Sequence, residues 1–177
     1  MSRLAREPFS YSSDPAVPSF PDDRPIILFD GHCALCSGYA QFVLAHDHAG
    51  ICRLLAAQSA LGRALYVHYG LDPYDFETNI LIADGRAYFK SEASIRILEL
   101  LGPPWSLARV LRLVPMSMRD FVYSFVARNR IRLFGKLETC YVPGVQFRDR
   151  VLNGGTSETL CFRATLPLNA DTSLQGA

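Results

Sequence analysis

Two cysteines separated by two residues mark the point where a predicted strand gives way to a predicted helix. The run from Ile27 to Cys36 reads Ile-Leu-Phe-Asp-Gly-His-Cys-Ala-Leu-Cys, and the pair is Cys33 and Cys36. A helix N-terminus has unpaired N–H groups and a partial positive charge, so it stabilises a thiolate. The second cysteine lies about one turn further along the same face, within disulfide reach. This arrangement is typical of a dithiol redox site.

The other cysteines argue against a disulfide framework. The chain has 177 residues and five cysteines, and Cys52, Cys140 and Cys161 have no close companion in the sequence. Residues 1–24 lack the apolar core of a secretory signal, and no stretch approaches the ~20 apolar residues of a membrane span. We therefore expect a reducing, cytoplasmic compartment and no membrane span. In that setting an isolated pair is catalytic or metal-binding rather than structural.

Apolar periodicity predicts alternating strands and helices along the middle of the chain. Strands are expected over residues 25–30, 51–56, 78–83 and 86–90. Helices are expected over residues 34–48, 59–69 and 91–101. Asp84-Gly85 is a strong two-residue hairpin signal, and Ser59 and Ser91 are placed to cap the helices that follow them. The predicted order is β-α-β, a short helix, then β-β-α.

Composition divides the chain into four parts. We expect a flexible N-terminal arm, an α/β core, a helical extension packed on the core and a loosely ordered tail, over residues 1–24, 25–102, 103–150 and 151–177. Within the extension, helices are expected over 105–114 and 117–134, with Pro115 separating them.

Several motifs, in order along the chain, resemble one protein family. Asp30-Gly31-His32-Cys33, followed by Cys36, resembles the Asp-x-x-Cys-x-x-Cys signature that names the DCC family of thiol-disulfide oxidoreductases. Further similar stretches are Ser91-Glu92-Ala93, Pro115 before Arg119-Asp120, and Arg128-Asn129-Arg130 before Phe134-Gly135-Lys136. The resemblance covers residues 25–150. It implies a thioredoxin-like α/β fold, β-α-β then β-β-α, with a helical C-terminal extension and a thiol–disulfide exchange activity.

The pair and its neighbour Asp30 are the predicted catalytic residues. We expect Cys33, at the helix start, to be the exposed and acidic nucleophile, and Cys36 to be more buried and to resolve the mixed disulfide. Two compatible roles are open for Asp30: holding the turn through backbone N–H groups, or accepting a proton and tuning the thiols. The substrate would be a protein or small-molecule disulfide. An external thiol reductant would reset the pair, because the sequence has no cofactor-binding motif.

One feature departs from ordinary thioredoxins. Those proteins place a cis-proline just before the hairpin strand, facing the cysteines and shaping the peptide-docking surface. Here the corresponding residues are Glu77, Thr78 and Asn79, with no proline among them. The usual backbone contacts to a peptide substrate are therefore not expected.

A non-catalytic module is the competing hypothesis. In that case the extension binds a partner, and the cysteine pair holds a metal or senses redox state. Structural zinc normally needs four Cys or His ligands. The sequence has only one Cys-x-x-Cys pair, and His46 and His48 lie too far along the helix to complete a tetrahedral site with it. We therefore expect no metal.

Three further residues could be mistaken for parts of the catalytic pair or could lie near it. His32 is expected to be a solvated turn residue, and Cys52 a small core residue in a buried strand. Cys140 is a candidate third thiol near the site.

The cationic residues are concentrated in one segment. Residues 101–136 hold seven Arg or Lys against the single acid Asp120, so the segment is +6 and the remainder −5, which gives the net charge of +1. An acidic partner, nucleic acid or an anionic lipid surface would fit this charge. We favour a solvated face that complements helix dipoles, without nucleic acid. The aromatic residues of this segment are expected in the core: Phe121, Tyr123, Phe125 and Phe134.

Overall fold

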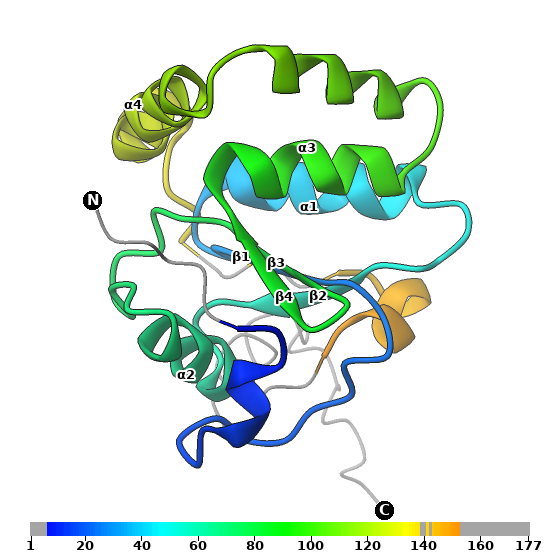
Figure 1. Cartoon of the computed structure of the whole chain (residues 1–177), viewed down its shortest axis with the longest axis vertical. Coiled ribbons are helices and arrows are strands. Elements are labelled where there is room, and N and C mark those ends of the chain that lie inside the picture. Colours follow the sequence, from blue (N-terminus) through cyan, green and yellow to red (C-terminus); the bar gives the residue numbers. More distant parts are fainter. Residues whose placement is uncertain (1–6, 139–140, 142, 153–177) are drawn as a thin grey trace, which may run out of the picture.

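A mixed β-sheet with helices on both faces forms the centre of the molecule (Figure 1). The computed structural model describes residues 7–138, 141 and 143–152.

The sheet has four short strands in the order β2-β1-β3-β4. Strand β1 (Ile26–Phe29) pairs in parallel with β2 (Arg53–Ala56) and antiparallel with β3 (Ile80–Ala83). Strand β4 (Arg86–Phe89) completes the hairpin with β3 through Asp84-Gly85. Asp84 and Gly85 both have positive φ angles, of 51° and 72°, as a two-residue hairpin turn requires.

In the described part of the chain, four α-helices and three 3₁₀ helices surround the sheet. The α-helices are α1 (Ala34–His46), α2 (Ala60–His68), α3 (Lys90–Leu100) and α4 (Met116–Phe134). The 3₁₀ helices are η1 (Ser10–Ser13), η2 (Trp105–Leu113) and η3 (Val145–Arg150).

Side chains that alternate along β1 separate two hydrophobic cores. Ile26 and Leu28 point to the face covered by α2 and the N-terminal segment. Ile27 and Phe29 point to the face covered by α1 and α3. Both faces of β1 are buried, which explains why its sequence is apolar throughout rather than alternating. The prediction of a thioredoxin-like α/β fold, β-α-β then β-β-α with a helical extension, is confirmed.

Helix caps agree with the sequence in one case and differ in another. The hydroxyl of Ser59 accepts a hydrogen bond from the N–H of Gly62 at 3.0 Å and caps α2. Helix α3 instead begins at Lys90 without a side-chain cap. Ser91 donates its hydroxyl hydrogen to Asp120 of α4. The expected cap is therefore wrong at Ser91, because a tertiary contact with the extension uses that side chain.

Residues at the two ends of the described chain lie against the core. The sequence predicts a flexible arm over 1–24, whereas residues 7–24 include η1 and the buried residues Tyr11 and Val17. The Tyr11 hydroxyl donates a hydrogen bond to Asp22 at 2.8 Å, so its burial leaves no unpaired polar atom. At the other end, the N–H of Leu152 donates to the Leu54 carbonyl, and residues 153–177 of the expected tail lie outside the described residues.

The helical extension differs from the core in what it exposes. Its expected core aromatics Phe121, Phe125 and Phe134 are 74%, 62% and 49% exposed, so that prediction is wrong for these three. Tyr123 alone turns inward, toward the sheet. Only one face of α4 packs toward the core, and that face carries Tyr123, Ala127 and Arg130. In the part of the chain that the structure describes, no helix is long and apolar enough to cross a membrane.

Candidate active site

The two cysteines occupy the first turn of α1. Cys33 is the N-cap residue, with an extended backbone, and its Sγ accepts a hydrogen bond from the N–H of Cys36 at 3.3 Å. A thiolate in this position satisfies one of the unpaired N–H groups of the helix and lies at the positive end of its dipole. Both cysteines are free thiols in the structure.

The pKa values of the two thiols shift in opposite directions. A hydrogen bond from the Cys36 side chain, supported by the Cys36 N–H, lowers the pKa of Cys33 to about 6, although burial and Asp30 act in the opposite direction. The same hydrogen bond, together with burial, raises the pKa of Cys36. The negative charge therefore resides on Cys33, and the proton on Cys36, near neutral pH.

Cys33 is less exposed to solvent than Cys36, which is the reverse of the prediction. Cys33 has 0% exposure, whereas Cys36 is half-buried and contributes to a cavity wall. The segment after α4 lies antiparallel beside Cys33: Lys136 forms a β-bridge with it, and the Leu137 N–H donates to the His32 carbonyl at 2.7 Å. The expectation of an exposed Cys33 and a more buried Cys36 is therefore wrong, because a distant part of the chain lies against the motif.

Asp30 is buried under the loop that carries the cysteines. It is 7% exposed, and one carboxylate oxygen accepts hydrogen bonds from the His32 N–H at 3.0 Å and from Gln58 Nε2 at 2.6 Å. Gln58 in turn accepts from the Gly31 N–H at 3.2 Å. These bonds fix the turn between β1 and α1.

Arg130 of α4 balances the charge of Asp30. Its guanidinium donates to the Asp30 carboxylate at 3.4 Å, to Asp75 at 3.1 Å and to the Ala127 carbonyl at 2.8 Å. Arg130 is only 7% exposed, and its positive charge also lowers the pKa of Cys33. The sequence predicts Arg130 as one of the cations of a solvated face, and that prediction is wrong for this residue because it is buried against Asp30. The signal that pointed to it was its place in the Arg128-Asn129-Arg130 motif.

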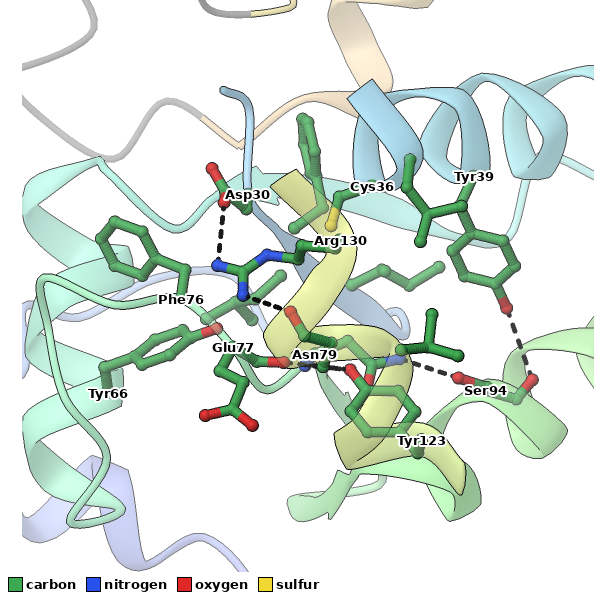
Figure 2. A pocket seen from close by; sticks show the side chains of 16 residues that line it. Asp30, Cys36, Tyr39, Tyr66, Phe76, Glu77, Asn79, Ser94, Tyr123 and Arg130 are labelled. Carbon is green, nitrogen blue, oxygen red and sulfur yellow. Dashed lines mark hydrogen bonds and ion pairs between the residues drawn. The ribbon is translucent and has the colours of Figure 1, made fainter. Parts of the chain in front are cut away.

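A cavity of about 210 Å³, partly open to solvent, lies between the first turn of α1, the segment before β3, and α4 (Figure 2). Cys36 lines the cavity and Cys33 does not. The remaining wall is mainly apolar or aromatic, with a few polar side chains, and includes Leu35, Tyr39, Phe76, Asn79, Tyr123, Val126 and Arg130. The extension therefore supplies one wall of a pocket that reaches the redox motif.

The other residues singled out in the sequence lie apart from this chemistry or outside the described chain. His32 is half-buried, and in the described chain its Nδ1 has no hydrogen-bond partner. Cys52 is a fully buried core residue, and burial raises its pKa to about 12. Cys140 and Cys161 lie outside the described residues.

Metal-ligand geometry is not found around the pair. Among residues 7–138, 141 and 143–152, no three His, Cys, Asp or Glu side chains gather in a way that could hold a metal ion. His46 packs its ring against Phe42 and Trp105, and its Nδ1 lies 2.8 Å from the Phe42 carbonyl oxygen.

Comparison with known proteins identifies the family. Residues 27–136 match the model of the DCC1-like thiol-disulfide oxidoreductases. The chain is 39% identical over 127 residues to the uncharacterized protein YuxK of Bacillus subtilis (strain 168), which covers 72% of this chain and 93% of that protein. It is 41% identical over 120 residues to the chloroplastic DCC family protein At1g52590 of Arabidopsis thaliana, covering 67% of this chain and 70% of that protein. No solved structure matches the chain. The chain belongs to the DCC1-like thiol-disulfide oxidoreductase family.

Proposed function

We propose that the chain catalyses thiol–disulfide exchange through Cys33 and Cys36. In the first step a protein thiolate attacks one sulfur of a substrate disulfide, forms a mixed disulfide and releases the other half of the substrate as a thiolate. In the second step the remaining cysteine attacks the protein sulfur of the mixed disulfide, and the Cys33–Cys36 bond forms as the second thiolate leaves. The dithiol loses two electrons and the substrate disulfide gains them.

One observation carries this proposal: the Cys33 sulfur caps α1 and is hydrogen-bonded to the cysteine one turn further on. This contact stabilises Cys33 as a thiolate, the form that attacks disulfides and leaves readily from them. An external thiol reductant would restore the dithiol, and a reducing compartment such as the cytoplasm would supply one.

We assign Asp30 to positioning the loop and to setting the charge balance of the pair. Its carboxylate raises the pKa of both thiols, while Arg130 lowers both. An Asp30→Asn variant should therefore shift the pH profile of exchange toward lower pH. If both the profile and the exchange rate were unchanged, Asp30 would be a structural residue alone.

The direct test is equilibration of the protein in buffers of reduced and oxidised glutathione. The wild-type protein should convert fully between dithiol and internal disulfide, as followed by alkylation and mass spectrometry. Neither Cys33→Ser nor Cys36→Ser should form that disulfide, whereas Cys52→Ser should behave as the wild type in this measurement. A wild-type protein that never forms a Cys33–Cys36 bond in any of these buffers would exclude the proposal.

The pH dependence of exchange follows from the lowered pKa of Cys33. Exchange that uses the Cys33 thiolate should lose rate as the pH falls through about 6, where that thiolate takes up a proton. An ordinary cysteine would lose rate near pH ~8.5 instead. Stopped-flow measurement of disulfide formation between pH 5 and 9 distinguishes these two cases, and a midpoint at the ordinary value would contradict the assignment.

A redox-sensing module is the second candidate, and the complete burial of Cys33 favours it. A sensor would form the internal disulfide stoichiometrically without repeated turnover. Multiple turnovers of a disulfide substrate in the presence of excess thiol would exclude this alternative.

A further inference from the structure

The cavity beside the cysteine pair has two polar atoms that no protein group satisfies. In the described part of the chain, Arg130 Nε and Asn79 Oδ1 are buried without a hydrogen-bond partner, and both residues line the cavity (Figure 2). Unpaired buried polar atoms are unfavourable, typically by about 1–3 kcal/mol each. A ligand with one acceptor and one donor would satisfy both atoms.

The cavity reaches only one of the two sulfurs. Cys36 lies in its wall, whereas Cys33 has 0% exposure and does not contribute to the lining. A molecule in the cavity therefore meets the sulfur of Cys36 first. Cys33 lies behind it, at the helix N-terminus.

The position where an extended peptide would pair with the protein is already occupied. The Tyr123 hydroxyl of α4 accepts a hydrogen bond from the Asn79 N–H at 2.9 Å and donates to the Glu77 carbonyl at 3.4 Å. These are the backbone groups of the segment that leads into β3, the predicted counterpart of the peptide-docking segment in thioredoxins. Helix α4 therefore blocks backbone pairing with a peptide and leaves a pocket in its place.

The size of the pocket limits its occupant. An apolar cavity of ~150 Å³ accommodates benzene, so about 210 Å³ holds a group of roughly eight to ten non-hydrogen atoms. A thiol of this size with an amide and a carboxylate matches the unpaired donor of Arg130 and the unpaired acceptor of Asn79.

We propose that the cavity binds a low-molecular-weight thiol, and that this thiol forms its mixed disulfide with Cys36 rather than with Cys33. The proposal rests on the exchange function proposed above and names its substrate class and the order of its steps. The thiolate of the small molecule attacks Cys36 Sγ of the internal disulfide, the new S–S bond forms, and the Cys33–Cys36 bond breaks. Cys33 leaves with the electron pair as the thiolate that caps α1. In the reverse direction Cys33 attacks Cys36 and releases the small thiolate.

The experiment uses N,N′-diacetylcystine, the disulfide of N-acetylcysteine, as its probe. The Cys33→Ser protein, which keeps Cys36, should gain one N-acetylcysteine at Cys36 about tenfold faster than the Cys36→Ser protein gains one at Cys33. Peptide mass mapping locates the adduct and excludes the other cysteines. Ionisation alone predicts the opposite order, because the backbone N–H of residue 36 still lowers the pKa of Cys33 in the Cys36→Ser protein, whereas burial still raises the pKa of Cys36 in the Cys33→Ser protein. Faster labelling of Cys33 would overturn the proposal.

Two valines of α4 provide a matched pair of variants. Val126 lines the cavity, and Val122 is 60% exposed one turn earlier. Val126→Phe should lower the rate of exchange with N,N′-diacetylcystine about tenfold by filling the pocket, whereas Val122→Phe should keep the wild-type rate. Both should keep the wild-type equilibrium of the cysteine pair with dithiothreitol, which shows that the fold and the pair are intact.

The outcomes separate this proposal from the one it rests on. If the wild-type protein reduces the disulfides of insulin faster than N,N′-diacetylcystine, the substrate class is wrong while thiol–disulfide exchange stands. If the pair never forms its internal disulfide, the exchange function itself fails.

A second, independent observation concerns the outer surface of η2 and α4. Thirteen of the sixteen exposed large hydrophobic residues in the described chain lie between Leu107 and Phe134. We call this set the outer apolar surface. The two helices form a layer at one end of the molecule, outside α3 and α1 (Figure 1). Its most exposed members are Leu113 at 85% and Phe121 at 74%. Large exposed apolar surfaces on a protein mark sites that bind another protein or a membrane.

The charge around the outer apolar surface is positive. Arg109, Arg132 and Lys136 are exposed, and no carboxylate in the described chain lies within ion-pair distance of them. Arg112 and Arg119 are neutralised by Glu92 and Glu99 of α3. Exposed aliphatic and aromatic side chains beside uncompensated cations match the boundary of an anionic bilayer, which has both acyl chains and negative headgroups.

We infer that the outer apolar surface binds the surface of an anionic lipid bilayer. The wild-type protein should sediment with vesicles of phosphatidylcholine and phosphatidylglycerol, and at least about tenfold less with phosphatidylcholine alone. A Leu113→Ser/Phe121→Ser variant should lose sedimentation, whereas Tyr74→Ser, at an 81% exposed aromatic residue that is not part of the outer apolar surface, should not. Failure of the wild type to sediment with the anionic vesicles would overturn the inference. Self-association that buries this surface, detected by analytical ultracentrifugation, would assign it to a second copy of the chain.

Discussion

The α/β core and the helical extension use apolar residues in opposite ways. Between residues 25 and 102, apolar side chains of the sheet are almost completely buried, and the exposed large hydrophobics are Val67 and Tyr74. Helices η2 and α4 expose most of theirs, and α4 buries only Ala127 and Arg130 fully. The apolar side chains of the core therefore pack against one another, whereas most of those on the extension face solvent.

The residues that the extension does turn inward surround the redox motif. Tyr123, Val126, Ala127 and Arg130 all line the cavity next to Cys36. The segment that follows, Gly135–Leu137, lies beside Cys33. The core therefore supplies the sheet and the thiol pair, and the extension supplies one wall of the cavity beside the pair.

The largest difference between the two regions should appear in the free energy of unfolding. Leu28→Ala removes a fully buried side chain of β1 and should cost about 2–5 kcal/mol. Phe125→Ala removes a larger side chain that is 62% exposed, and its effect should stay within about 0.5 kcal/mol. Urea denaturation of the two variants measures both. A loss of several kcal/mol from Phe125→Ala would show that its ring is buried in solution and would remove the contrast.

A smaller loss of stability is expected when the ion pair between Arg130 of the extension and Asp30 of the core is removed. Arg130→Met leaves the buried Asp30 without its cation and should cost about 1–3 kcal/mol. Because Arg130 also lowers the pKa of Cys33, the pH midpoint of exchange should rise in this variant.

Arg132→Met provides the control for that measurement. Arg132 lies on the same helix, is exposed, and should change neither stability nor the pH midpoint. An equal effect of the two substitutions would mean that the net charge of α4, rather than the contact with Asp30, is responsible.

The fold was predictable because its signals are local. Apolar runs gave the strands to within two residues, Asp84-Gly85 gave the hairpin, and Cys33 lies at the start of α1 as the pattern indicates. Ser91 does not cap α3, and its hydroxyl instead hydrogen-bonds to Asp120, which lies in a later helix. No local rule includes such a contact.

The site was predictable only in its cysteines and in the turn role of Asp30. Whether Cys33 is exposed depends on Lys136, about a hundred residues away, and the pairing of Arg130 with Asp30 spans the same separation. The exposed aromatics of α4 were misassigned for a related reason. An amphipathic pattern shows which helix face is apolar, but the packing of η2 and α4 on α3 decides which face is covered.

The smallest effect on stability is expected at Tyr123, where the extension contacts the segment that leads into β3. Tyr123→Phe removes one hydroxyl and its hydrogen bonds to Asn79 and Glu77, at a cost of about 0.5–1.5 kcal/mol. The freed backbone groups should then be available to an extended peptide, so insulin disulfides should be reduced faster than by the wild type. The rate with N,N′-diacetylcystine should change less, because the ring still forms the cavity wall. If both substrates respond equally, Tyr123 acts on the cysteine pair itself and does not control access to it.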